Sequence, residues 1–132
     1  MAQSDENEKT TISGDTLKIR LQEANNIPPS LVLVMGPTDQ IGRQWTLNEN
    51  EIKIGRNTDC FICINDRSVS KYHAVIKIEN QQATVTDLQS TNGTEVARHR
   101  LTSEIPHKLR DNDHIKIGNV ILKFLEKGNI ES

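Results

Sequence analysis

The sequence predicts an all-β fold, either an antiparallel sandwich or a barrel. Residues 31–125 consist of short runs rich in Val, Ile, Leu and Thr, and most of these runs are closed by Gly, Pro, Asn or Asp turn signals. None of this region keeps the 3.6-residue apolar period of an amphipathic helix. Short strands at regular spacing, without helices between them, are typical of antiparallel sheets that pack face to face or close on themselves.

The expected strands begin after Pro28-Pro29, which interrupts the chain and marks the expected start of the domain. In chain order they are residues 31–34, 44–47, 51–54, 61–64, 74–78, 83–87, 114–117 and 120–124. The first four runs end at Gly36-Pro37, Asn48-Glu49-Asn50, Gly55 and Asn65-Asp66. The last two pairs of strands are separated by so few residues that we expect hairpins, with turns at Asn80-Gln81-Gln82 and Gly118-Asn119.

The expected organisation is one ordered domain between two short segments. We expect residues 1–27 to be a flexible tail, because residues 1–16 hold three apolar side chains and cannot bury enough surface to offset the entropy of ordering. Within the tail, Leu17–Leu21 alternates with period two and could form a short edge strand. The domain is expected over residues 28–126, and residues 127–132 are expected to begin a linker to a further domain.

Composition excludes several classes of protein. A net charge of −2 argues against a surface that is basic overall, as nucleic-acid or anionic-membrane binding would need. No apolar run approaches the roughly 20 residues that cross a bilayer, and the first residues do not form a secretory signal. The sequence therefore predicts a soluble, cytoplasmic protein.

Cys60 and Cys63 form a lone CxxC pair. It could be a redox pair or half of a zinc site, but no second CxxC or His pair completes a metal site. The neighbouring Phe61, Ile62 and Ile64 favour a buried strand, on which residues three apart point to opposite faces. We therefore expect two small buried hydrophobic side chains, no metal and no cofactor.

Three loops between the expected strands have unusually specific residues. They are Gly55–Asp59, Ser68–His73 and Asp87–Thr94. Gly-Arg at 55–56, Ser-x-x-His at 70–73 and Ser-Thr-Asn-Gly-Thr at 90–94 closely resemble the signature of the forkhead-associated (FHA) domain family. Residues 109–118 resemble the Leu-x-x-x-Asp-x-Ile-x-Ile-Gly ending of that family, and the resemblance covers about residues 31–125.

The resemblance implies an antiparallel sandwich of about eleven strands whose loops bind phosphothreonine at one end. The residues it assigns to the phosphothreonine site are Arg56, Ser70, Lys71, Thr91 and Asn92, with Gly55, His73 and Gly93 in supporting roles. Such a ligand carries close to two negative charges and several strong acceptor oxygens. A forked guanidinium, an ammonium, two hydroxyls and an amide suit it.

The sequence departs from the family pattern at three places. Ser68 stands where some relatives have a charged residue that reads the peptide. Lys71 stands where many relatives have Arg, and residues 97–100 replace the usual Asn-Gly turn. We expect phosphate binding to survive these changes, whereas the preferred peptide sequence is left open.

The sequence thus predicts a non-enzymatic phosphothreonine-binding module of a bacterial signalling protein, which implies a Ser/Thr protein kinase. Its ligand could be its own tail, because Thr10 and Thr11 resemble the Glu-Thr-Thr-Ser tail that some bacterial FHA regulators bind in cis. Residues 123–131 resemble the junction that precedes a diguanylate cyclase (GGDEF) domain, so the module could regulate an attached cyclase. The alternative is a stand-alone adaptor that binds phosphorylated partners in trans.

Two other classes of function remain as alternatives. An enzyme could use Ser70 with His73, but the chain has no nucleophile elbow and no third member of a triad. A nucleic-acid binder could use Arg98–Arg100, but this cluster is short and has no interleaved aromatic side chains.

Overall fold

The computed structural model describes residues 27–127. The expected strand 17–21, the tail threonines Thr10 and Thr11, and residues 128–132 lie outside the described residues. Within 27–127 the structure contains strands and turns only. No helix among these residues is long and apolar enough to cross a membrane.

Eleven strands make up the domain. They are β1 (Ser30–Met35), β2 (Gln44–Thr46), β3 (Glu51–Gly55), β4 (Ile62–Cys63), β5 (Ala74–Glu79), β6 (Gln82–Asp87), β7 (Thr94–Val96), β8 (His99–Arg100), β9 (His107–Lys108), β10 (His114–Ile117) and β11 (Val120–Leu125).

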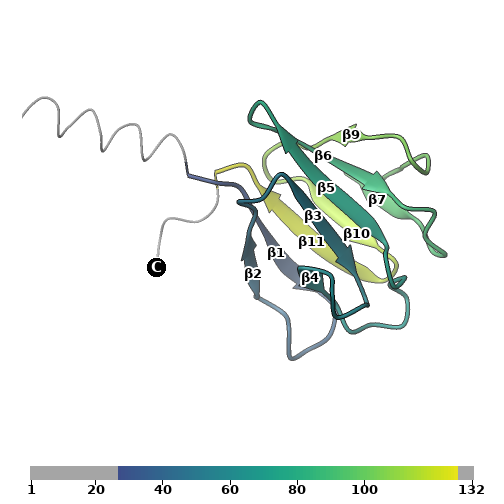
Figure 1. Cartoon of the computed structure of the whole chain (residues 1–132). Helices are drawn as coiled ribbons and strands as arrows, with labels where there is room; N and C mark the ends of the chain where they lie inside the picture. The colour runs from purple at the N-terminus through teal and green to yellow at the C-terminus, as the bar shows by residue number, and fades with distance from the viewer. Residues whose placement is uncertain (1–26, 128–132) are drawn as a thin grey trace, which may run out of the picture.

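The strands form the two layers of a sandwich (Figure 1). One sheet has the order β2-β1-β11-β10-β7-β8, and the other has the order β4-β3-β5-β6-β9. All strand pairs in the described chain are antiparallel except β3 and β4, which run parallel. The predicted all-β sandwich is confirmed.

Aliphatic side chains from the inner faces of both sheets fill the core. The alternation is clear on β11, where Val120, Leu122 and Phe124 are buried and the residues between them are half-exposed. Trp45 is 4% exposed and packs in this core, as expected, and Arg43 covers its ring at 5.1 Å from the centroid.

The structure differs from the sequence prediction in a few elements. Three strands were not predicted: β7, β8 and β9, each two or three residues long. The expected strand 61–64 is reduced to β4, and Phe61, which is 55% exposed, lies outside it. Cys60 is buried as expected, but Cys63 is only half-buried, so the prediction that both thiols are buried was wrong for Cys63.

Candidate functional site

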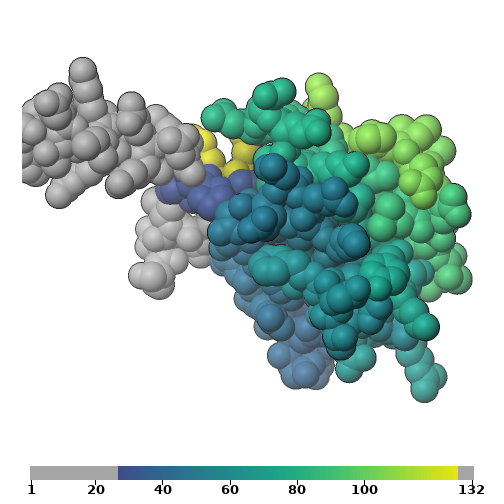
Figure 2. All heavy atoms as spheres, in the orientation of Figure 1, coloured from purple at the N-terminus to yellow at the C-terminus, as the bar shows by residue number. Residues whose placement is uncertain are grey.

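The three loops singled out in the sequence leave the same end of one sheet. β3 ends at Gly55, β5 begins at Ala74 and β6 ends at Asp87, and these strands are hydrogen-bonded neighbours. Because β5 is antiparallel to both neighbours, its first residue lies beside their last residues, Ala74 facing Ile54 and Asp87. In Figure 2 the blue and teal atoms, from the part of the chain around residue 60, cover the lower part of the visible face.

Backbone contacts join the first loop to the second. The Arg56 N–H donates to the Ser70 carbonyl at 3.0 Å, and the Asn57 N–H donates to the Lys71 carbonyl at 3.2 Å. The approach is so close that a Cβ on Gly55 would lie 2.1 Å from the Lys71 carbonyl oxygen. Only glycine fits there, which accounts for the Gly-Arg pair in the motif.

The Arg56 side chain is anchored at one nitrogen. Its Nε donates to the Val69 carbonyl at 2.9 Å, while the residue as a whole is exposed. No other side-chain hydrogen bond joins this guanidinium to residues 27–127. Its two terminal nitrogens are therefore left to donate to an anion as a fixed fork.

Ser70 links the second loop to the third. Its Oγ accepts a hydrogen bond from the Thr91 N–H at 3.0 Å, so the hydroxyl proton remains to be donated elsewhere. The neighbouring Lys71 is exposed, and its backbone is fixed by the bond from Asn57.

His73 is fully buried and holds the second and third loops together. Its Nδ1 accepts from the Ser70 N–H at 3.0 Å, so in the neutral ring Nε2 carries the proton and donates to the Gly93 carbonyl at 2.9 Å. Burial lowers the pKa of His73, against the opposing effects of the Gly93 carbonyl and the Asp87 charge. The imidazole contacts the Ser70 amide and not its hydroxyl, which disfavours a nucleophile–base pair.

Thr91 and Asn92 lie exposed at the tip of the third loop. Asn92 Nδ2 donates to the Ser68 carbonyl at 2.8 Å, which leaves the amide oxygen as an acceptor. The structure thus brings together all five residues that the resemblance assigns to the site, on three loops joined by hydrogen bonds.

Asp87, at the end of β6, is a structural centre of the site that sequence reasoning missed. Its buried carboxylate accepts hydrogen bonds from three hydroxyls, those of Ser90, Thr94 (2.7 Å) and Ser103 (2.8 Å). Burial acts to raise the pKa of Asp87, but these hydrogen bonds outweigh it and the pKa is lowered. The available signal was an Asp at a strand end followed by several hydroxyl residues.

A fourth loop, between β10 and β11, also reaches the site. The Asn119 N–H donates to Ser68 Oγ at 2.8 Å, and Ser68 Oγ donates to Asp66 at 2.6 Å. A Cβ on Gly118 would lie 2.3 Å from the Ser68 carbonyl oxygen. Ser68 therefore has its hydroxyl fully engaged inside the protein.

The two cysteines border the site without forming a metal centre. Cys60 Sγ lies 3.4 Å from the Lys71 carbonyl oxygen, and Cys63 Sγ lies 3.6 Å from the Arg56 carbonyl oxygen. Among residues 27–127 there is no group of three or more His, Cys, Asp or Glu side chains that could hold a metal ion.

The chemistry of the exposed groups points to an anionic, oxygen-rich ligand. Arg56 and Lys71 supply positive charge, and the hydroxyls of Ser70 and Thr91 supply further donors. The groups converge from loops fixed by backbone contacts, so little ordering is required when a ligand binds.

Comparison with known proteins identifies a family of similar domains. The model of the FHA domain family matches residues 52–118. The glycogen accumulation regulator GarA of Mycobacterium tuberculosis is 34% identical over 98 residues, which cover 74% of this chain and 59% of GarA. The oxoglutarate dehydrogenase inhibitor of Corynebacterium efficiens is 33% identical over 103 residues, covering 77% of this chain and 70% of that protein.

Solved structures show the same fold. An FHA domain studied for phosphothreonine-dependent interactions is 32% identical, with a TM-score of 0.65, over 74% of this chain and 94% of the other. The FhaA FHA domain, complexed with the intracellular domain of Rv3910, is 32% identical with a TM-score of 0.64, over 73% of this chain and 98% of the other. The chain spans 59% of the length of the GarA regulators it matches.

Proposed function

This chain belongs to the FHA domain family, and from that premise we propose that it binds phosphothreonine on proteins through Arg56, Ser70, Lys71, Thr91 and Asn92. Its relatives include a regulator and an enzyme inhibitor, and the FHA domain of this chain is a binding module and not an enzyme. A relative at 32% identity makes phosphothreonine-dependent interactions, which supports the same ligand here.

The observation that carries the proposal is the directed set of donors around Ser70. The Ser70 hydroxyl accepts from Thr91 and so offers its proton outward, and Arg56 is anchored through Nε with its fork free. Phosphate needs such a set, because each of its oxygens accepts strong charge-assisted hydrogen bonds. Asn92, with its amide oxygen unused, is suited to grip the backbone of an extended peptide.

Calorimetry with phosphorylated and unphosphorylated threonine peptides tests the proposal. Charge-assisted hydrogen bonds contribute about 1.5–3 kcal/mol each, so Arg56→Ala should weaken phosphopeptide binding at least about tenfold. Arg56→Lys should recover only part of this, because the planar fork is lost. The matched control is Arg110→Ala, an exposed arginine in the β9–β10 connection. Equal affinity of Arg56→Ala and the parent protein would rule out the assigned site.

We further propose that the ligand is the chain's own tail, phosphorylated on Thr10 or Thr11 by a Ser/Thr kinase. Sixteen residues lead from Thr11 to Ile27, and fully extended they span roughly 55 Å. A domain of this size is only about 35 Å across, given a radius of gyration near 13 Å. The tether would set an effective concentration near millimolar, so a site of about micromolar affinity would be mostly occupied.

A phosphorylated partner bound in trans is the alternative. The FhaA complex with an intracellular domain of another protein supports it by analogy. Mixing phosphorylated and unphosphorylated tail variants with a labelled phosphopeptide separates the two modes. A tail bound in cis should exclude the peptide whatever the protein concentration, whereas a tail that does not bind leaves the site open.

An attached diguanylate cyclase stays a proposal that rests on the resemblance of residues 123–131 alone. The FHA regulators found among the relatives carry other names and supply no such link. The coding sequence beyond codon 132 tests it directly. We expect a GGDEF domain there, and any other continuation would contradict the proposal.

A further inference from the structure

Arg100 lies against the loop that carries Thr91 and Asn92. It ends β8, and its guanidinium packs over Gly93 so closely that a Cβ on Gly93 would lie 2.3 Å from the Arg100 Cζ. Gly93 has a φ of +84°, which also favours glycine. The third loop and Arg100 are thus built to fit each other, and the fit places a cation beside the site.

Contacts between neighbouring loops connect Arg56 at one side of the site with Arg100 at the other. Arg56 contacts Val69 and Ser70 of the second loop, which in turn holds the third loop through Ser70 Oγ and the Ser68 carbonyl. Arg100 follows beyond Gly93. The candidate phosphate-binding residues, which include Arg56 and Lys71, therefore have a third cation beside them on the side of the third loop.

No acidic group within residues 27–127 neutralises Arg100. Its cross-strand neighbour is Glu95, but no carboxylate oxygen in this range lies within salt-bridge distance of the guanidinium. Asp87, a buried acid at the start of the third loop, accepts hydrogen bonds from three hydroxyls. Arg100 itself is exposed, so its charge faces solvent and any ligand bound at the loops.

We propose that Arg100 reads an acidic side chain of the bound peptide within about three residues of the phosphothreonine. The proposal rests on the proposed function and adds the sequence class of the ligand to it. Ser68, whose hydroxyl is engaged by Asp66 and Asn119, is not free to read a charge. The chain's own tail has one such residue, since Glu8 precedes Thr10 by two positions.

The test measures the affinities of two proteins, the parent and Arg100→Gln, for each of two peptides by fluorescence anisotropy. The probe peptide has the sequence of residues 4–15 phosphorylated on Thr10, and its partner peptide has Gln in place of Glu8. Exposed ion pairs contribute up to about 1 kcal/mol, so the parent protein should prefer the acidic peptide by about three- to fivefold at low salt. In Arg100→Gln the preference should fall below about twofold.

Arg98→Gln is the matched control, because Arg98 lies in the same β7–β8 hairpin as Arg100 but lines a hollow with Val34 and Lys116 instead of packing on Gly93. It should keep the preference. Equal loss of affinity for both peptides in Arg100→Gln would mean that Arg100 only supports the loop, and would overturn the proposal. So would a parent protein that binds both peptides equally well. A parent protein that binds neither peptide, but still binds other phosphothreonine peptides in calorimetry, would instead contradict the tail as the ligand.

Discussion

Gly55 is the residue at which the first two loops approach most closely. A Cβ there would lie 2.1 Å from a backbone oxygen, which cannot move without shifting the loop that carries Ser70 and Lys71. We expect Gly55→Ala to destabilise the domain by at least about 2 kcal/mol and to weaken phosphopeptide binding. Denaturation in urea measures the first effect and calorimetry the second.

Gly36→Ala is the control for this prediction. The nearest atoms to a Cβ on Gly36 are side-chain carbons at 3.4 Å, which is ordinary contact, and its φ is not positive. We expect a change within about 1 kcal/mol there. If Gly55→Ala unfolds at the same urea concentration as Gly36→Ala, the claim that the first two loops leave no room for a Cβ at residue 55 is contradicted.

His73 makes the stability of the site depend on pH. Its folded-state pKa is lowered by burial, so below the ordinary value of 6.5 the unfolded chain takes up a proton before the folded domain does. Stability is therefore complete above about pH 6.5 and falls as the pH decreases toward the folded pKa, by at most about 1.4 kcal/mol per pH unit. The pKa of Asp87 is also lowered, so the stability that its carboxylate contributes is present above about pH 4 and is lost only below it.

Urea denaturation at pH 7.5, 6.5 and 5.5, together with NMR titration of the imidazole protons, measures this effect. His99→Gln removes an exposed histidine and should leave the slope unchanged. An imidazole of His73 that titrates at or above pH 6.5 would contradict the buried, neutral bridge between Ser70 and Gly93.

At the scale of elements, β6 and β7 meet the third loop through Asp87. Asn at this position keeps the shape but has one acceptor oxygen, and its amide would face hydroxyls that now donate. We expect Asp87→Asn to cost about 2 kcal/mol or more, because buried polar groups lose their partners. Ser103→Ala removes a single hydroxyl and should cost about half of that or less. Comparable stability of Asp87→Asn and the parent protein would refute the central role of the carboxylate.

The elements that the sequence predicted share one physical property. Strands such as β1, β5 and β11 place several β-branched or aliphatic residues in the core, so their pattern is strong. The missed strands β8 and β9 are two-residue segments of His, Arg and Lys at sheet edges, held by the neighbouring strand rather than by apolar burial. Strands that are held by edge pairing have no characteristic apolar pattern, so the sequence does not predict them.

The turn before β8 and the start of β4 escaped prediction for related reasons. Ala97 and Arg98 both have positive φ, a conformation usually signalled by Asn or Gly. Phe61 lies exposed although it is aromatic. In both places the tertiary structure overrides local preference. The five candidate site residues could be proposed from the sequence because they lie in short loop motifs, whereas the contacts of Asp87, Gly118 and Arg100 join distant segments.

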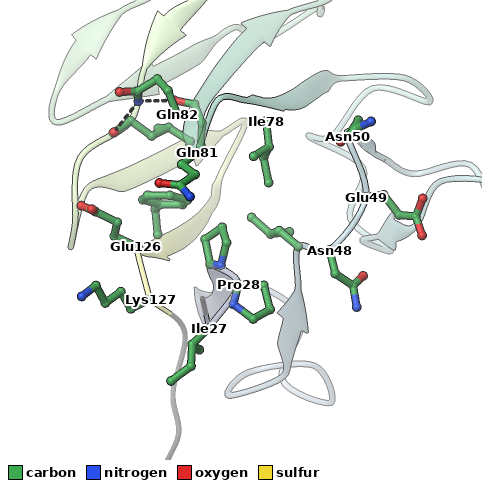
Figure 3. A pocket seen from close by; sticks show the side chains of 15 residues that line it. Ile27, Pro28, Asn48, Glu49, Asn50, Ile78, Gln81, Gln82, Glu126 and Lys127 are labelled. Atoms are coloured by element: carbon green, nitrogen blue, oxygen red, sulfur yellow. Dashed lines mark hydrogen bonds between the residues drawn. The ribbon is translucent and has the colours of Figure 1, made fainter. Parts of the chain in front are cut away.

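At the scale of the whole molecule, the described residues begin at the end of the sandwich opposite the candidate site. Ile27 and Pro28 line a pocket of about 430 Å³ with Asn50 and Gln82, at the turns farthest along β3 and β6 from the site loops (Figure 3). In Figure 1 this end of the domain lies at the left, away from the loops at the lower right. A tail that binds in cis must therefore run the length of the domain.

This geometry selects among the tail threonines. Eleven residues lead from Thr16 to Ile27 and span at most about 38 Å, barely the roughly 35 Å of the domain, which leaves no slack for binding. From Thr11 or Thr10 the extended chain reaches roughly 17–20 Å farther. We therefore expect phosphorylation at Thr10 or Thr11, but not at Thr16, to shift the backbone amide signals of Arg56, Ser70 and Asn92 in NMR spectra of the full chain.

The control for the tail prediction is a Thr10→Ala/Thr11→Ala chain treated with the same kinase, which should keep the unphosphorylated spectrum. Arg56→Ala should also keep it after phosphorylation, because the fork that holds the phosphate is gone. The shifts should not depend on protein concentration if the tail binds its own domain, since the tether fixes the effective concentration. Shifts that appear only at high concentration would indicate binding between two chains, and an unchanged spectrum after complete phosphorylation would place the ligand on another protein.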